Sequence, residues 1–323
     1  MNEFYEMLDG SFIQWIEEIW DIRIQGVRGD LDIQGSPERT LSRVAVEDHQ
    51  GRIFILEKFA LGKLENRQRI AVALERLNGR GLSQALGGMV GKKDRILNVY
   101  KDGAYQITPF IPGSTLARPH WLDSPEIGKS LADFLIQMKS IPDSLTMDLG
   151  FDHFDIKPYI QGLFKGMENH DPKRARQYLP FWEFLNSGFM DRRKGLRFTF
   201  CHGDFHPLNI IWDNHRLQAV IDWEFAGFKP DIYDAANLVG CAGIEHPQGL
   251  VGPMVITFLH EIRKSGIICP GSWGWFLEYV LALRFAWLSE WLRKEDTQML
   301  ETEAAFMEIL IRHRADLREA WEI

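Results

Sequence analysis

The sequence predicts an α+β protein in which a small, β-rich amino-terminal lobe precedes a larger, mainly helical carboxy-terminal lobe. Three observations lead to this class. About the first hundred residues alternate helix-like and hairpin-like segments, whereas helical periodicity dominates the rest of the chain. An island of short apolar runs at 196–227 interrupts the helical part. The length of 323 residues exceeds what one hydrophobic core usually serves, so we expect two lobes.

The chain begins with a predicted helix, a loop and a hairpin. Residues 3–20 place apolar side chains at loose helical spacing among acidic ones. Residues 26–40 mix Gly, Asp, Ser and Pro, which is typical of a loop. Two strand-like runs within 41–59 flank a polar turn at 48–51, and this pattern indicates a β-hairpin.

A second helix and hairpin complete the first lobe. The segment 65–78 has helical spacing and ends before Gly79 and Gly81, which suit a helix stop. Strand candidates at 95–100 and 104–111 then flank a short turn. We therefore expect the order helix, hairpin, helix, hairpin.

The second lobe is predicted to be helical. Ser124 is a candidate N-cap and Pro125 suits the first position of the helix that follows. Further helices are expected near 154–168, 174–188, 248–265, 273–293 and 297–318. We place the division between residues 1–108 and 109–323, with a hinge near 109–113.

Composition narrows the possible functions. The formal net charge of -8 argues against a nucleic-acid binder, which needs a basic face to neutralise phosphates. No uninterrupted apolar run approaches the roughly 18 residues that cross a bilayer, and the acidic amino terminus lacks the layout of a signal peptide. The three cysteines, Cys201, Cys241 and Cys269, suit reduced thiols better than a disulfide framework. We expect a cytoplasmic protein with a small-molecule substrate; its oligomeric state is left open.

The most informative stretch is "HGDFHPLNI", residues 202–210, which lies between apolar strands. A tight hairpin after it would return Asp222 to the neighbourhood of Asn209. Their side-chain oxygens would then lie beside the carboxylate of Asp204. Mg²⁺ prefers oxygen ligands and is commonly held by one or two carboxylates together with substrate phosphates. The island therefore predicts a site for a nucleotide and its metal ion.

Three quoted segments carry a family resemblance. "HGDFHPLNI", "VIDWEFAG" and "KPDIYDAANL" together resemble the aminoglycoside phosphotransferase and choline kinase-like family. The resemblance implies a protein-kinase-like bilobal fold. It also implies a Mg²⁺-dependent enzyme that moves the γ-phosphoryl group of ATP or GTP to a hydroxyl of a small molecule.

The resemblance implies a role for five residues of the island. Asp204 would orient the acceptor hydroxyl and take its proton, and Asn209 and Asp222 would hold Mg²⁺. His202 and Asp234 would support the catalytic loop, and Asp234 would anchor, as its N-cap, the start of a helix near the site.

The nucleotide contacts expected in the first lobe follow the resemblance less closely. Gly35 and Ser36 lie in the turn that would cover the phosphates. Lys58 is our candidate for the lysine that contacts phosphates, although alignment of the apolar residues puts Glu57 at that position. The backbone of the linker would face the adenine at Pro109, Phe110 and Ile111. On the acceptor side we expect His206, Glu224 and Trp287.

Two alternatives stay open. Glu57 and Ile70, at positions where the resemblance predicts a lysine and its acidic partner, suit a nucleotide-binding protein of the same fold that has lost catalysis. His202, Asp204 and His206 could instead be the ligands of a metallohydrolase. The acceptor of a kinase also stays open among aminoglycosides, choline, ethanolamine, homoserine and sugar-like alcohols, as does the choice of ATP or GTP.

Overall fold

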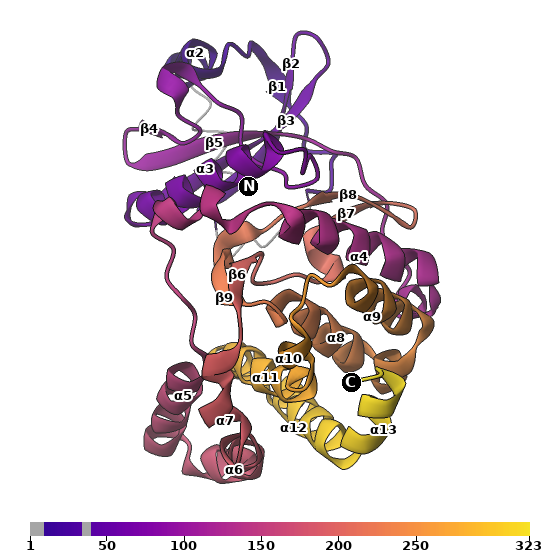
Figure 1. The fold of residues 1–323 in the computed structure, drawn as a ribbon. Helices are drawn as coiled ribbons and strands as arrows, with labels where there is room; N and C mark the ends of the chain where they lie inside the picture. The colour runs from indigo at the N-terminus through magenta and orange to yellow at the C-terminus, as the bar shows by residue number, and fades with distance from the viewer. Residues whose placement is uncertain (1–9, 34–39) are drawn as a thin grey trace.

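A five-stranded antiparallel sheet forms the amino-terminal lobe in the computed structural model, which describes residues 10–33 and 40–323. The strands lie in the order β1-β2-β3-β5-β4. Their bounds are Ile24–Val27 for β1, Ser42–Asp48 for β2, Ile53–Ala60 for β3, Asn98–Tyr100 for β4 and Gly103–Pro109 for β5. Figure 1 shows this sheet at one end of the molecule and the helical lobe below it.

Two helices cover opposite faces of the sheet. Helix α2 (Gly10–Trp20) packs Phe12 and Ile16 against the face that carries Leu56 of β3. Helix α3 (Leu64–Asn78) lies on the other face, where Ala71 joins a small cluster with Phe59. Because neighbouring residues of a strand point to opposite faces, this arrangement decides which side chains of β3 face the second lobe.

The predicted hairpins are confirmed. The backbone of β2 pairs with β3 about a turn in which the Asp48 carboxylate accepts from the amides of Gln50 and Arg52, both at 2.9 Å. Strands β4 and β5 form the second hairpin. The sequence interpretation missed β1, which lies partly in the segment predicted to be a loop and pairs with β2.

Helices make up most of the second lobe. Their bounds are Pro125–Ser140 for α4, Ile156–His170 for α5, Pro172–Asn186 for α6, Phe189–Arg192 for α7, Tyr233–Glu245 for α8, Pro253–Ser265 for α9, Pro270–Trp273 for α10, Phe276–Arg293 for α11, Thr297–Arg312 for α12 and Arg314–Ala320 for α13. The Ser124 hydroxyl accepts from the Ile127 amide at 3.3 Å, which confirms the predicted N-cap. The helix predicted at 297–318 is interrupted at His313. Among the helices of the described residues, none is long and apolar enough to span a membrane.

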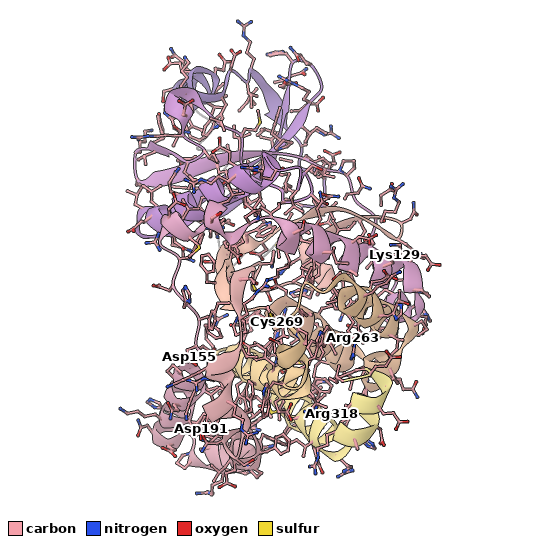
Figure 2. All side chains as sticks on the ribbon, viewed as in Figure 1. Lys129, Asp155, Asp191, Arg263, Cys269 and Arg318 are labelled. Atoms are coloured by element: carbon pink, nitrogen blue, oxygen red, sulfur yellow. The ribbon has the colours of Figure 1, made fainter. Side chains whose placement is uncertain are left out.

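Helices α5, α6 and α7 pack together at the end of the molecule remote from the sheet (Figure 1). Two acidic residues labelled in Figure 2 hold this corner together. Asp155, the N-cap of α5, accepts from Nε of Arg193 at 2.7 Å, and Asp191 accepts from Nζ of Lys157 at 3.2 Å. These helices therefore extend the lobe without approaching the sheet.

Two short β-ribbons lie between the sheet and the helices. Strand β6 (Phe198–Cys201) pairs with β9 (Gly227–Pro230), and β7 (Ile210–Asp213) pairs with β8 (Arg216–Val220). The sequence predicted three of these strands and missed β9. Because the segment from His202 to Asn209 joins β6 to β7, both of its ends are fixed by ladder hydrogen bonds.

Helices α4 and α9 approach closely at Gly128. A Cβ atom built on Gly128 would lie 2.2 Å from the carbonyl oxygen of Met254, a separation that requires the helices to move apart. We predict that Gly128→Ala lowers the free energy of unfolding by about 1 to 3 kcal/mol, the usual cost of overpacking.

The matched control is Gly162→Ala in the exposed middle of α5, where a Cβ would meet nothing within 4 Å. This change should raise the free energy of unfolding by about 0.5 to 1 kcal/mol, because alanine has the higher helix propensity. Chemical denaturation of both variants tests the pair. Equal effects at the two positions would contradict the close contact.

Candidate active site

Asp204 lies at the centre of the polar loop and is held by its neighbours. Its carboxylate Oδ2 accepts from Nδ2 of Asn209 at 3.0 Å, and its backbone oxygen accepts from the same amide at 2.9 Å. Nε2 of His206 lies 3.5 Å from its Oδ1. Asp204 is 9% exposed, so its carboxylate is almost buried and is oriented by protein groups.

His202 braces the loop from within the protein. Its ring is fully buried; Nε2 donates to the carbonyl oxygen of Ile221 at 2.9 Å, and Nδ1 accepts from the Asp204 amide at 3.1 Å. Burial lowers the pKa of His202, against the opposing effect of Asp234 and Asp204. With both nitrogens engaged in the protein, the ring acts as a spacer between Asp204 and the strand end at Ile221.

Asp234 fixes the first two residues of the loop. Its Oδ2 accepts from the His202 amide at 3.0 Å, and its Oδ1 accepts from the Gly203 amide at 2.9 Å. The predicted N-cap role of Asp234 is wrong, because Ile232 occupies the cap of α8 and the carboxylate points to the loop. Helix α8 is therefore anchored to the loop through a side chain of its first turn.

Gly203 is required by the course of the backbone at this point. Its φ is +86°, and a Cβ there would lie 2.1 Å from the carbonyl oxygen of Phe225. Both observations exclude a larger residue without rearrangement.

The second hairpin brings Asp222 beside Asn209, as predicted. Strand β8 runs back along β7, and the Ile221 amide donates to the Asn209 carbonyl oxygen at 2.9 Å. Asp222 follows at once with a left-handed φ of +65° and lines a cavity. The structure therefore gathers Asp204, Asn209 and Asp222 at one corner.

Two cavities lie beside this corner. The first, of about 450 Å³, lies between the sheet and the second lobe and is lined by Asp222, Ile70 and the linker residues Pro109, Phe110 and Ile111. The second, of about 670 Å³, lies within the helical lobe and is lined by His206. Asp32, Ile33 and Thr115 line both cavities.

The structure does not bring Lys58 to the first cavity. Lys58 lies on the α2 side of β3, where Nζ contacts Asp102 Oδ1 at 3.1 Å and sits over the ring of Tyr105. Its neighbour Glu57 faces the cavity instead and accepts at Oε1 from Nη2 of Arg43 at 2.6 Å. Lys58 is thus removed from the expected nucleotide contacts, because strand alternation turns it to the opposite face.

Two arginines supply positive charge to the first cavity. Arg43 of β2 is opposite Glu57 in the β2–β3 ladder, and its side chain lines the cavity. Arg67 of α3 also lines it; its guanidinium lies over the ring of Phe59 at 4.5 Å and 3.5 Å from Oε2 of Glu224. Sequence reasoning missed both residues. The register of the first hairpin, which pairs position 43 with 57, is the signal that could have found Arg43.

The three residues expected on the acceptor side separate into two groups. His206 and Trp287 both line the second cavity, with their ring centroids 5.8 Å apart. Glu224 points to the amino-terminal lobe instead, where its carboxylate contacts Nζ of Lys63 at 3.1 Å. Its assignment to the acceptor side is therefore corrected. Gly35 and Ser36 fall outside the described residues.

A transition-metal cage is not formed by the histidines of the loop. Within 10–33 and 40–323, no three or more His, Cys, Asp and Glu side chains are grouped to hold a metal ion. Both ring nitrogens of His202 are already hydrogen bonded in the protein. The oxygens of Asn209 and Asp222 suit Mg²⁺, which takes further oxygens from water and phosphate. The donor set therefore fits a nucleotide-bound magnesium ion better than a metallohydrolase centre.

Comparison with known proteins agrees with this geometry. A model of the phosphotransferase enzyme family matches residues 37–261. The chain belongs to this family. No curated protein sequence matches the chain significantly.

Solved structures of phosphotransferases share the fold at low sequence identity. An amicoumacin kinase, determined with AMP-PNP and Ca²⁺, is 13% identical with a TM-score of 0.63, over 96% of each chain. A macrolide 2′-phosphotransferase from Brachybacterium faecium is 14% identical with a TM-score of 0.58, over 92% of this chain and 96% of that chain. An aminoglycoside phosphotransferase with GDP and kanamycin is 18% identical with a TM-score of 0.58, over 95% and 99%. The protein-kinase-like bilobal α+β fold of this chain is thereby confirmed.

The buried state of His202 predicts a pH dependence of stability. The unfolded chain binds a proton at this histidine near its ordinary pKa of 6.5, whereas the folded protein binds it at lower pH. Unfolding therefore takes up protons, and the free energy of unfolding falls as pH drops below 6.5. The loss reaches at most about 1.4 kcal/mol per pH unit.

Chemical denaturation at about pH 7 and about pH 5.5 tests this prediction on wild type and His202→Gln. The variant should be less stable at neutral pH but should lose less stability on acidification. An equal loss in both proteins would contradict the assignment of a neutral, buried His202.

Proposed function

We propose that this protein is a cytoplasmic, Mg²⁺-dependent phosphotransferase that moves the γ-phosphoryl group of ATP or GTP to a hydroxyl of a small molecule. The observation that carries the proposal is the grouping of Asp204, Asn209 and Asp222 beside two cavities: Asp222 lines the first, and His206, which contacts Asp204, lines the second. One cavity would hold the nucleotide and the other the acceptor, with the reacting oxygen and phosphorus between them.

Asp204 is proposed as the general base. Its Oδ2 is held by Asn209 and its Oδ1 faces His206, so the carboxylate is oriented before any substrate arrives. The acceptor hydroxyl gives its proton to Asp204 as its oxygen forms a bond to the γ-phosphorus. The bond from that phosphorus to the bridging oxygen then breaks, and ADP or GDP leaves. This positioning role suits phosphoryl transfer, which needs alignment and charge neutralisation more than covalent help.

Asn209 and Asp222 are proposed to hold Mg²⁺, which would neutralise charge on the nucleotide phosphates. Because Nδ2 of Asn209 donates to Asp204, the side-chain carbonyl oxygen is the atom that suits a cation. The described lining of the first cavity carries Asp32, Glu57 and Asp222 against Arg43 and Arg67. Because the three carboxylates outnumber the two guanidiniums, these side chains cannot neutralise the phosphates of a nucleotide. A further cation is needed, which supports the requirement for Mg²⁺. The amicoumacin kinase structure likewise contains a nucleotide analogue and Ca²⁺.

The linker at 109–113 is proposed as the hinge between a lobe of residues 1–108 and a lobe of residues 109–323, and as the contact for the nucleotide base. Proline has no amide hydrogen, and the Phe110 amide donates to the Ile53 carbonyl oxygen at 2.9 Å. Of Pro109, Phe110 and Ile111, the Ile111 amide is thus our candidate donor to the base. Gly35 and Ser36 are kept as proposed contacts of the phosphates.

We propose that Arg67 and Arg43 make the phosphate contact that was first expected of Lys58. Both side chains line the cavity that also contains Asp222, whereas Lys58 lies across the sheet. A guanidinium binds two phosphate oxygens at once, so either arginine suits this contact. Glu57 holds Arg43 and Glu224 lies near Arg67, which keeps both guanidiniums at the cavity wall.

The second candidate is a nucleotide-binding protein that has lost catalysis, and Glu57 in the cavity is the observation that favours it. An assay of ADP and GDP release with pooled metabolites and aminoglycosides, with and without Mg²⁺, separates the two. Acceptor-dependent release that requires Mg²⁺ supports the kinase. Thermal stabilisation by nucleotide without release across the whole panel supports the degenerate protein.

Replacement of Asp204 should separate turnover from binding. We predict that Asp204→Ala lowers kcat by on the order of 10² to 10⁴-fold, because the base that receives the proton is lost. The Kd for nucleotide should change little. Asp213→Ala, at the exposed end of strand β7 that follows the loop, is the control and should keep full turnover. Full turnover by Asp204→Ala would exclude its proposed role.

Arginine and lysine variants test the phosphate contacts. We predict that Arg67→Ala raises the Kd for ATP or GTP by about tenfold or more, because a charge-assisted contact worth roughly 1.4 kcal/mol is lost. Lys58→Ala removes the same charge from the same lobe and should leave Kd unchanged. Isothermal titration calorimetry measures both constants, and thermal denaturation confirms folding. If Lys58→Ala weakened nucleotide binding and Arg67→Ala did not, the phosphate contact would be assigned to Lys58.

A further inference from the structure

The reaction class does not identify the acceptor, but the lining of the second cavity indicates what kind of molecule can bind there. It is enclosed by the segment 114–121, the polar loop, the end of α8 and the outer part of α11. Its apolar lining consists of Ile33, Leu116, Trp121, Pro207, Leu208, Ile210, Trp212, Ile244, Trp287, Trp291 and Met299. A volume of about 670 Å³ lies in the range of sites that bury drug-sized molecules. The site therefore offers an acceptor a large apolar and aromatic surface.

The charged groups of this cavity are already compensated within the protein. Nε of Arg118 donates to Oε1 of Glu245 at 2.8 Å, which neutralises the carboxylate at the end of α8. Nε of the buried Arg284 donates to Oε2 of the buried Glu303 at 2.9 Å. The remaining carboxylate of the described lining is that of Asp32, an exposed residue shared with the first cavity. Asp204 adds one more negative charge at the point of transfer.

Trp287 and Trp291, the two tryptophans that α11 contributes to the cavity, already interact with groups of the protein. Nε1 of Trp291 donates to Glu303 at 3.1 Å, so its polar edge is directed into the lobe. The guanidinium of Arg284 lies 5.7 Å from the ring of Trp287, and Nζ of Lys294 lies 5.9 Å from the ring of Trp291. Each ring thus has a protein cation as a neighbour, and a cationic ligand beside it would meet like charge.

A ligand with several positive charges needs several carboxylates that are not already neutralised, because each desolvated cation must regain in the site what it loses in water. The described lining of this cavity instead provides two guanidiniums, each already paired with a carboxylate, and one exposed carboxylate, that of Asp32. On the basis of the proposed function, we propose that the acceptor is a largely apolar, ring-containing alcohol with no more than one positive charge. Its hydroxyl would be directed to Asp204 past His206, and its ring system would pack against Trp287 and Trp291.

Equilibrium binding tests this inference without any requirement for phosphoryl transfer. The full-length protein would be titrated calorimetrically with a panel of neutral and singly charged ring alcohols that includes erythromycin, and with kanamycin and gentamicin as polycations. At least one member of the first set should bind about tenfold or more tightly than either polycation, a difference of about 1.4 kcal/mol. Tighter binding of the polycations, or binding of neither set, would overturn the proposal.

Trp287→Ala should weaken the binding of the tightest ring alcohol about tenfold or more, because an aromatic wall of the site is removed. Trp182→Ala, in α6 and outside the cavity lining, is the matched control and should leave this binding unchanged. An equal loss in both variants would show that the site had been placed wrongly.

Arg118→Ala gives a test by gain of binding. Arg118 is exposed, and its loss would leave the Glu245 carboxylate without its guanidinium partner at the cavity wall. Kanamycin should then bind more tightly relative to the ring alcohol than it does to wild type. Arg312→Ala removes the same charge near the far end of α12 and should not change this ratio. An unchanged ratio in Arg118→Ala would contradict the charge argument.

The two proposals fail in different ways. A ring alcohol that binds but is never phosphorylated would support the ligand class proposed for the second cavity and would overturn the kinase. Phosphorylation of kanamycin with tighter binding than any ring alcohol would confirm the kinase and overturn the acceptor assignment.

Discussion

The carboxylate of Asp234 is the constraint on which the site depends. Its two oxygens accept from consecutive amides of the polar loop, at His202 and Gly203. Charge-assisted bonds of this kind are stronger than those between neutral groups, and here they lie in a buried setting. Asp234 is itself 0% exposed, and Nζ of Lys139 lies 3.8 Å from its Oδ2, which provides the opposite charge that a buried carboxylate requires. The loop is thus fixed to α8 before any substrate binds.

Hydrogen bonds of His202 connect this anchored part of the loop to the residues proposed to hold Mg²⁺. The ring of His202 joins the Asp204 amide to the Ile221 carbonyl oxygen, and Ile221 in turn pairs with Asn209. One chain of hydrogen bonds therefore sets the distances among Asp204, Asn209 and the residue that follows Ile221, which is Asp222. Preorganisation of this kind reduces the reorganisation needed at the moment of transfer.

Much of the fold and the centre of the site could be predicted from sequence because both depend on local patterns. A polar loop between two apolar strands, followed by a turn at hairpin distance, is enough to place Asp222 beside Asn209. Strand β9 was missed because "GFKP" is short and contains a lysine and a proline, so its pairing with β6 arises from tertiary packing. The N-cap role of Asp234 was wrongly predicted because a carboxylate at a helix start is equally able to cap the helix or to bind a distant loop.

The orientation of β3 could not be predicted from alternation, because that strand is apolar on both faces. Lys58 and Glu57 are neighbours on β3 and point to opposite faces of the sheet. A one-residue error in the orientation of the strand therefore places a cation in the cavity where the structure has an anion. The hairpin register resolves the ambiguity, since Arg43 is paired with Glu57 across the ladder. Glu224 illustrates the same limit, because its partners Lys63 and Arg67 come from the other lobe and no local pattern connects them.

The distribution of charge in the two cavities beside Asp204 connects these features. On one side, the carboxylates of the described lining exceed the arginines by one, so that a polyanion can enter only with a cation of its own. On the other side, both arginines of the described lining are paired with carboxylates, Asp32 is the remaining acidic residue, and aromatic rings form part of the wall. Asp204 stands between these two environments. An electrostatic asymmetry of this kind would admit a metal-bound nucleotide to the first cavity and keep the second for a ligand that binds through apolar surface, so each substrate would be directed to its own side of the transferred group.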